Sequence, residues 1–349
     1  MCFSCGQMAM TLYMPRPTVI CLCPVKNESW ILDRFLKCAS AWADHIIVLD
    51  QLSNDGSRDI ARRYSKVMLL DNSNLDFNEP ERQAMLLEAA RRIPGPRLLI
   101  ALDADEVLSA NFMNGLEWTN LLNAPAGTVG FFKWENVAPD FTYCWLGGHG
   151  SSIPFAFMDD GSEHVGDVIH SRRVPTPPQA PEMHFQDIRV LHYQFTDWQR
   201  MRSKQRWYQC WERLNRPARS SIDIYRQYHH MDGITDAEKH PLCESWLRGY
   251  EQRGIDMRTV CSQSLSHWDR EVILFFIQHG SAMFKREAVW DVDWVELAMR
   301  MMPEISDRNF ADPRSWVDKA VHAWLQRTQS HLSKLSVRVV DKAIKMLGW

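Results

Sequence analysis

Three acidic residues follow an apolar run in the stretch "LLIALDADE", residues 98–106. They are Asp103, Asp105 and Glu106. Like charges placed this close together raise one another's pKa and destabilise the fold unless something neutralises them. A divalent cation is the obvious candidate, because Mg²⁺ and Mn²⁺ prefer hard oxygen ligands such as carboxylates. The stretch therefore indicates a metal site at the end of a buried strand.

The elements that must position these acids form a regular pattern in the first third of the chain. Four near-continuous apolar runs predict strands buried on both faces. They lie at 18–23, 45–50, 66–71 and 97–103. Helix-like segments separate them, at 28–42, 57–65 and 79–92. This alternation predicts an α/β fold, with a mostly parallel sheet flanked by helices.

Polar residues follow each predicted strand at its carboxyl end, where α/β sheets bind ligands. The first strand leads into "PVKNE", the second into Asp50 and "QLSNDGS", and the third into Asp71. Acids thus converge on one edge from several strands. The alternative is that these acids merely end strands and cap helices, as Asp55 could do before "GSRDIA".

Two phosphate-binding motifs are absent. No GxGxxG follows the first strand, and no GxxxxGK[ST] occurs anywhere. A nucleotide bound at this edge would therefore lack a glycine-rich nest for its phosphates. A metal ion held by carboxylates would take over that role.

Four motifs occur in a specific order: "PVKNE", "DQLSNDGS" with the spacing D-x-x-S-x-D-G-S, an arginine-containing helix, and "LDADE". In this order they resemble the nucleotide-sugar half of family 2 glycosyltransferases, which have the Rossmann-like GT-A fold and a DxD motif. The resemblance implies a flexible N-terminus (1–16), a GT-A domain (17–200) and a mainly helical C-terminal region (201–349). Within the GT-A domain it implies a nucleotide-sugar half, 17–110, and an acceptor half, 111–200.

The resemblance also implies roles for individual residues. Those expected beside the nucleotide are Pro24, Asn27, Glu28, Asp50, Asp55, Arg82 and Asp103. Asp50 would accept a hydrogen bond from the base, usually uracil, and Asp55 would support its loop. The expected metal ligands are Asp103, Asp105 and His192, which would hold Mn²⁺ or Mg²⁺ together with a UDP-sugar donor.

The segment 155–175 resembles the acceptor side of bacterial members. Many relatives read "IHE" where this chain has His170 followed by Ser171. An inverting transferase needs a carboxylate to deprotonate the acceptor hydroxyl. We expect this base in "MDDGSE", as Asp160 or Glu163; the alternative is a plain turn. The acceptor would be a carbohydrate-type molecule: a polysaccharide, a lipid-linked glycan or a protein.

Composition narrows the function classes. The 349 residues carry a formal net charge of −3, which gives no global drive toward nucleic acid. The apolar runs are all far shorter than the roughly 18 residues of a membrane span. Nine cysteines, an odd number, predict reduced thiols and a cytoplasmic setting. Cys2 and Cys5 form a lone CxxC, for which a disordered terminus is a simpler explanation than zinc.

Two segments beyond residue 196 leave alternatives open. The helix-like stretch 197–214 is either a core stripe with a basic face or a binding site. In a binding site, Lys204 or Arg206 would meet the leaving diphosphate, or the tryptophans would lie under a sugar ring. The tail, 316–349, has apolar residues at mostly helical spacing and carries six Lys/Arg against two Asp. Such a basic amphipathic helix suits the inner face of an anionic membrane, or packing on the domain or on another subunit. The pattern of residues 216–270 indicates no role.

Three other function classes compete with a glycosyltransferase. A phosphatase of the haloacid-dehalogenase type also has an apolar strand followed by DxDxV, as in "DADEV", but there the motif ends the first strand of the core. A methyltransferase needs glycines after its first strand, and "PVKNE" has none. A non-catalytic, membrane-associated scaffold would not need an intact DxD. The sequence thus favours a metal-dependent, inverting glycosyltransferase.

Overall fold

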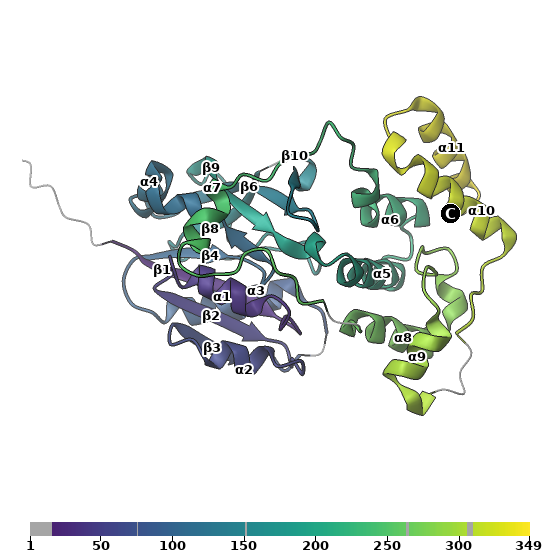
Figure 1. The fold of residues 1–349 in the computed structure, drawn as a ribbon, viewed down its shortest axis with the longest axis horizontal. Helices are drawn as coiled ribbons and strands as arrows, with labels where there is room; N and C mark the ends of the chain where they lie inside the picture. The colour runs from purple at the N-terminus through teal and green to yellow at the C-terminus, as the bar shows by residue number, and fades with distance from the viewer. Residues whose placement is uncertain (1–15, 75, 151, 263–264, 306–309) are drawn as a thin grey trace, which may run out of the picture. The chain divides into compact units, whose positions relative to one another are not determined.

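The computed structural model describes residues 16–349, apart from 75, 151, 263–264 and 306–309 (Figure 1). The predicted flexible N-terminus, except Arg16, and the Cys2–Cys5 pair lie outside the described residues. The chain divides into two compact units, each gathered from separate segments. The first comprises the described part of Met1–Trp134, with Gly148–Leu191 and Glu244–Met257. The second comprises Glu135–Gly147, His192–Cys243 and Arg258–Trp349, so the units interleave along the chain, unlike the predicted division at residue 200.

Four parallel strands form the centre of the first unit, in the order β4-β1-β2-β3. Their bounds are β1 Thr18–Val25, β2 His45–Asp50, β3 Val67–Asp71 and β4 Arg97–Ala101. Beyond β4 the sheet continues through two antiparallel strands, first β8 and then β6. Strand β9 pairs with β6 and with the short strand β5. The bounds of these strands are β8 Ser152–Met158, β6 Val129–Val137, β5 Glu106–Leu108 and β9 Glu182–His192. The four predicted strands are confirmed, but β3 is an edge strand and is not buried on both faces as predicted, because Met68 is 43% exposed.

Helices connect the strands of the first unit, as the apolar pattern predicts. They are α1 Leu32–Ala39, α2 Ser57–Arg62, α3 Glu79–Arg91, α4 Leu116–Leu122 and α7 Ser245–Glu251. The side chain of Asn78 caps the start of α3 by accepting from the backbone N–H of Glu81. Leu86 and Leu87 of α3 pack on a sheet face that includes Ile20. The neighbouring Cys21 points to the other face and is also fully buried, so the predicted α/β fold is confirmed.

The strand order creates a topological switch. From β1 the chain proceeds outward through β2 to β3, and it then returns to form β4 on the other side of β1. The two connections that leave the carboxyl ends of β1 and β4 therefore diverge. In open α/β sheets, the crevice outside such a pair of strands is where ligands bind.

The second unit is mainly helical. It contains the end of β6 from Glu135, the strands β7 Tyr143–Leu146 and β10 His240–Pro241, and six α-helices. The helices are α5 Trp198–Asn215, α6 Ser221–Tyr228, α8 His267–His279, α9 Trp294–Met301, α10 Trp316–Thr328 and α11 Leu335–Met346. Side-chain caps mark the start of several of these helices. Ser315 and Asp318, for example, form a reciprocal capping box at the start of α10.

The structure favours the interpretation in which the aromatic stripe of α5 belongs to the core. Trp207 and Trp211 are buried. The guanidinium of Arg206 is also buried and lies 3.0 Å from carboxylates of both Asp269 and Asp291. Arg206 therefore belongs to an ion-pair network within the second unit, which does not fit the alternative in which it meets a diphosphate.

The predicted C-terminal tail forms two helices rather than one. Helices α10 and α11 pack together with α6 around Ile222, Tyr225, Leu325 and the C-terminal Trp349. The predicted packing on the domain is thus present within the second unit. Among the described residues, no helix combines the length and the apolar character needed to cross a bilayer.

Candidate functional site

An arginine that the sequence analysis missed lies among the acids beyond β4. The guanidinium Nη2 of Arg173 lies 2.6 Å from Asp103 Oδ2 and 2.7 Å from Glu106 Oε1. Burial alone would lower the pKa of Arg173, but the two carboxylates raise it above its usual value. The chain therefore neutralises part of the acidic cluster with its own cation. The only signal in the sequence was the Arg pair in "HSRRVP", some seventy positions away.

Glu106 fixes the turn that presents Asp103. Its Oε2 accepts the backbone N–H of Asp103 at 2.9 Å, and its own N–H donates to the Asp103 carbonyl at 3.0 Å. Burial raises the pKa of Glu106 well above its usual range, and the nearby carboxylates add to this effect while Arg173 opposes it. Glu106 thus holds the loop, whereas the side chain of Asp103 is 42% exposed and faces solvent.

Asp105 and Glu28 lie in the same neighbourhood, at the carboxyl end of β1. Burial raises the pKa of the Cys23 thiol, and the charges of Asp103, Glu28 and Asp105 raise it further. Each of the three predicted acids therefore lies in the neighbourhood of this thiol of β1, on the side of the topological switch. Asp105 is only 2% exposed, and Glu28 accepts the indole N–H of Trp30 at 2.7 Å.

Hydrogen bonds from side chains join the loops after β1 and β2. The backbone N–H of Asn27 donates to Ser53 Oγ at 2.8 Å, and Asn27 Oδ1 accepts the backbone N–H of Asn54 at 2.9 Å. Asn27 adopts φ 57°, a left-handed conformation that asparagine tolerates well. Pro24 stands just before this loop, in the ladder opposite Leu49 of β2.

Asp55 ties the two loops together more tightly. Its Oδ2 accepts the backbone N–H of Ser29 at 2.9 Å, while its Oδ1 accepts the Ser57 hydroxyl at 2.6 Å and backbone N–H at 3.0 Å. Burial alone would raise the pKa of Asp55, but these hydrogen bonds to its charged form lower it below the usual value. Its contacts are those of a loop support.

Asp50 lies at the end of β2 with its two oxygens in different environments. Oδ2 accepts the backbone N–H of Ser53 at 3.0 Å and the Arg58 guanidinium at 2.8 Å. Arg58 also bridges to Asp71 at the end of β3, at 2.6 Å. In contrast, Asp50 Oδ1 is buried and has no hydrogen-bond partner within the described parts of the chain. A buried carboxylate oxygen without a donor is costly.

Arg82 occupies the first turn of α3 at the same edge. Its guanidinium lies over the Phe77 ring, 4.6 Å from the ring centre, and 3.9 Å from Glu79. Its Nε is buried without a hydrogen-bond acceptor among the residues that the structure describes. The neighbouring Glu79, which the sequence analysis did not single out, accepts the backbone N–H of Ser171 at 2.6 Å. Burial raises the pKa of Glu79.

The positions of Asp160 and Glu163 do not fit the predicted role of a catalytic base beside the acids. Strand β8 runs antiparallel to β4, and the N–H of Asp159 bonds to the carbonyl of Arg97, where β4 begins. Asp103 lies six residues further along β4 and beyond it, about 20 Å away at the rise of a strand. Asp160 instead accepts the N–H of Ser162 at 2.9 Å, which favours the turn interpretation. The Ser162 carbonyl is held by Arg91 at the far end of α3, which keeps Glu163 at that edge as well.

His192 belongs to the second unit. It is buried, and its Nδ1 lies 2.8 Å from the side-chain oxygen of Asn136. Its assignment as a metal ligand stays a prediction from the family resemblance. The first unit by itself supplies Asp103 and Asp105.

The acids of the first unit are of the ligand type that a hard divalent cation takes, although the structure does not bring the ligand atoms of three of the described ones together. Asp103, Asp105 and Glu106 offer carboxylate oxygens, the ligand type that Mg²⁺ and Mn²⁺ prefer. Arg173 contributes one positive charge against three carboxylates, which leaves the cluster suited to further cationic charge. Asp103 and Asp105 are the residues that would hold the ion, because Glu106 is committed to the loop.

Comparisons with known proteins give weak matches. No model of a known protein family matches the chain, and neither does any curated protein. One similar solved structure is glucosyl-3-phosphoglycerate synthase from Mycobacterium tuberculosis with Mg²⁺ and UDP, at 16% identity and a TM-score of 0.27. That match covers 34% of this chain and 44% of the other.

Two further solved structures match over different shares of the chain. A 4-diphosphocytidyl-2C-methyl-D-erythritol synthase has 14% identity and a TM-score of 0.22, and the match covers 26% of this chain and 48% of that one. HddC from Yersinia pseudotuberculosis has 11% identity and a TM-score of 0.28, with 48% and 88% covered. Likenesses this distant carry no functional argument, so the function rests on the geometry.

Proposed function

We propose that the first unit binds a UDP-sugar with Mn²⁺ or Mg²⁺ and transfers the sugar to a carbohydrate-type acceptor. Two buried atoms that have no hydrogen-bond partner among the described residues carry the proposal: Asp50 Oδ1, which is an acceptor, and Arg82 Nε, which is a donor. Both lie at the carboxyl edge of the parallel strands, where α/β sheets bind ligands. A nucleotide supplies what both lack, because it carries a base N–H and anionic phosphate oxygens.

Each residue of this edge would have a distinct task. Asp50 would accept the imide N–H of uracil, and Arg82 would donate to a phosphate oxygen. Asp103 and Asp105 would hold the cation, which when bound would supply positive charge beside the diphosphate. Arg173 would orient Asp103 through their 2.6 Å contact. An inverting course stays a prediction from the family resemblance, and the anomeric configuration of the product would test it.

Isothermal calorimetry with nucleoside diphosphates tests the donor site. We expect UDP to bind more tightly than GDP in the presence of Mn²⁺ and to lose most of its affinity in the presence of a chelator. Asp50→Asn should weaken UDP binding by about 10- to 100-fold, because the amide oxygen would stay with the donors of Ser53 and Arg58 and its NH₂ group would face the imide N–H. The matched control is Asp160→Asn at the opposite edge, which should bind UDP as the wild type does. Preferential binding of GDP, or binding unaffected by chelator, would contradict the proposal.

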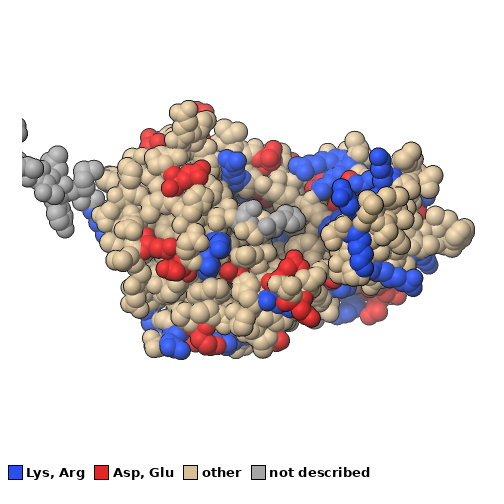
Figure 2. Space-filling view, turned by 90° about the horizontal axis from the view of Figure 1, so that it is seen from above, with Lys and Arg blue, Asp and Glu red and all other residues tan. Residues whose placement is uncertain are grey.

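We also propose that α11 touches an anionic membrane surface. Leu335, Val339 and Met346 share one face of this helix and are 73%, 58% and 80% exposed. Lys334, Arg338 and Lys342 lie among them and are exposed as well. Figure 2 shows Lys and Arg side chains gathered over the helical part of the second unit. Apolar side chains rimmed by basic ones suit a surface of anionic lipid headgroups.

Cosedimentation with vesicles tests this contact. The protein should bind vesicles that contain phosphatidylserine and should be released by high salt, since the attraction is partly electrostatic. The double variant Leu335→Ser/Met346→Ser should bind at least about tenfold more weakly, because it removes two exposed apolar side chains. Leu116→Ser changes an equally exposed leucine, 81% accessible, in the first unit and should have no effect. Equal binding by all three proteins would exclude α11 as the contact.

A further inference from the structure

Three side chains with different metal-binding atoms meet in the second unit. Glu135 on β6, Cys144 on β7 and His240 on β10 each offer one ligand atom, and these atoms lie within 4.8 Å of one another. Among the described residues, no other group of three or more histidine, cysteine and acidic side chains has its ligand atoms this close together. None of the three belongs to the proposed donor site.

The strand register explains why these side chains meet. Cys144 is the cross-strand partner of His240 on one side and of Val137 on the other, so all three point to the same face. Glu135 precedes Val137 by two residues and therefore shares that face. Three neighbouring strands thus build the cluster, and a register shift of one residue would separate it.

The distances suit a metal of zinc's size. Zinc bonds to sulfur at about 2.3 Å and to nitrogen or oxygen at about 2.0–2.2 Å, so tetrahedral ligands lie roughly 3.3–3.8 Å apart. His240 Nε2 lies 2.9 Å from Glu135 Oε2, which now makes a hydrogen bond. That contact would open by about half an ångström to admit an ion between the two atoms. Cys144 Sγ now donates weakly to the carbonyls of His240 and Pro241, at 3.7 and 3.9 Å.

We propose that Glu135, Cys144 and His240 form a zinc-binding site. The mixed set of thiolate, imidazole and carboxylate suits zinc, whereas Mg²⁺ and Mn²⁺ prefer oxygen alone. Three protein ligands leave a fourth position for water or another ligand, the pattern of an open zinc site. Binding would release the thiol proton from Cys144 and leave the carboxylate and the neutral imidazole as ligands. Glu135 and Cys144 are buried, and the side chain of His240 is 38% exposed, which gives the ion an approach from solvent.

The site would fasten an edge of the sheet. Strand β10 has only two residues, His240 and Pro241, and one of them is a proline that cannot donate to the ladder. A bond through the metal to Cys144 and Glu135 would hold this short strand far more firmly than its backbone pairing does. The alternative is that His240 and Glu135 make a plain ion pair, which needs no metal.

Cobalt substitution separates the two possibilities. The metal-free full-length protein should bind Co²⁺ at this site and show the intense sulfur-to-metal charge-transfer absorption of a cobalt thiolate, and one equivalent of Zn²⁺ should abolish that absorption. Cys144→Ser should remove this absorption and weaken Zn²⁺ binding at least about 100-fold, more than the loss of an outer-shell contact costs. The control Cys261→Ser changes an exposed thiol and should leave both unchanged.

Two further variants test the remaining ligands and the independence of the site. His240→Ala should also weaken Zn²⁺ binding, whereas Asp105→Asn should not, because Asp105 belongs to the acidic cluster of the first unit. If Asp105→Asn still binds zinc, the zinc site is independent of the proposed donor site. The zinc proposal would then hold even if the protein does not bind UDP. The proposal is overturned if the wild type shows no thiolate absorption with Co²⁺, or if Cys144→Ser binds Zn²⁺ as tightly as the wild type.

Discussion

The Asp105→Asn variant should turn over a UDP-sugar about 10²- to 10³-fold more slowly than the wild-type protein at a Mn²⁺ concentration that just saturates the wild type. The reason is the charge of the leaving group. A departing diphosphate develops negative charge, and this chain has neither glycine-rich phosphate motif to stabilise it. The acids at the switch between β1 and β4 would instead stabilise it through a cation, and an amide at position 105 holds that cation more weakly. The rate of donor hydrolysis, monitored as the release of UDP, measures the effect without a known acceptor.

The controls separate a lost ligand from a damaged fold. Asp105→Asn keeps the shape of the side chain, so its circular dichroism should match that of the wild type. Asp160→Asn removes a carboxylate from the opposite edge of the same sheet and should turn over the donor normally. Excess Mn²⁺ should partly restore Asp105→Asn if the defect is weak metal binding. If Asp105→Asn and the wild type have equal rates, then Asp105 does not serve the metal.

The parallel core could be predicted because its information is local. Short continuous apolar runs are typical of buried strands, and the segments between them are helix-like, with Asn78 as a cap before α3. Val19, Ile20, Cys21 and Leu22 are all at most 1% exposed, which is the burial that such a run predicts. The convergence of acids on one edge followed from the parallel direction of the strands alone.

Residues brought from a distance could not be predicted. Arg173 reaches Asp103 across seventy positions, and Glu79 holds Ser171 across ninety-two. Nothing in the local pattern around Arg173 distinguishes it from a solvated arginine. Yet it supplies part of the neutralising charge that the acids beyond β4 had led us to assign to a metal alone. The cation is therefore proposed in addition to Arg173, not in place of it.

The misplacement of Asp160 has a different cause. The sequence gives the position of "MDDGSE" along the chain but not the direction of the strand before it. Because β8 runs antiparallel to β4, its end lies where β4 begins, and the turn that follows falls on the opposite edge from the acids. Mixed sheets are common, so strand direction has to be known before a residue can be assigned to an edge.

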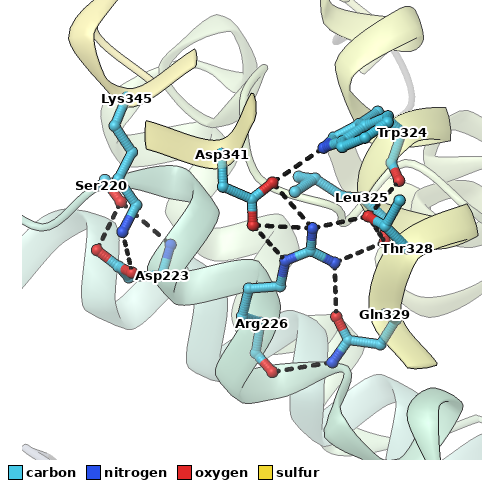
Figure 3. A network of polar contacts seen from close by, with 9 residues as sticks. All are labelled: Ser220, Asp223, Arg226, Trp324, Leu325, Thr328, Gln329, Asp341 and Lys345. Atoms are coloured by element: carbon cyan, nitrogen blue, oxygen red, sulfur yellow. Dashed lines mark hydrogen bonds and ion pairs between the residues drawn. The ribbon is translucent and has the colours of Figure 1, made fainter. Parts of the chain in front are cut away.

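The Arg226→Met variant should lower the free energy of unfolding of the second unit by about 3–5 kcal/mol. Figure 3 shows the Arg226 guanidinium of α6 between Asp341 of α11 and the end of α10. It contacts both carboxylate oxygens of Asp341 at 3.0 Å, the Leu325 carbonyl at 2.8 Å and the Thr328 hydroxyl at 2.8 Å. The side-chain oxygen of Gln329 accepts from one more N–H, so all five N–H groups of the guanidinium have acceptors. Removing it would leave a half-buried Asp341 with the Trp324 indole as its remaining contact in this network.

A second ion pair between the same two helices provides the matched control. Lys345 of α11 pairs with Asp223 of α6, and both side chains are at least one-third exposed. Lys345→Met should therefore cost at most about 1 kcal/mol, as solvent-exposed pairs do. Urea unfolding followed by tryptophan fluorescence measures both, since Trp324 and Trp349 lie in this cluster.

A double variant decides what the buried pair contributes. If the large loss in Arg226→Met arises because Asp341 is left buried without its cation, then removing that charge as well should recover much of the stability. We therefore expect Arg226→Met/Asp341→Leu to be more stable than Arg226→Met alone, which is the opposite of additive losses. Additive losses would mean that each side chain stabilises the helices separately. Losses of similar size in Arg226→Met and Lys345→Met would mean that burial does not set the strength of the contact between α6 and α11.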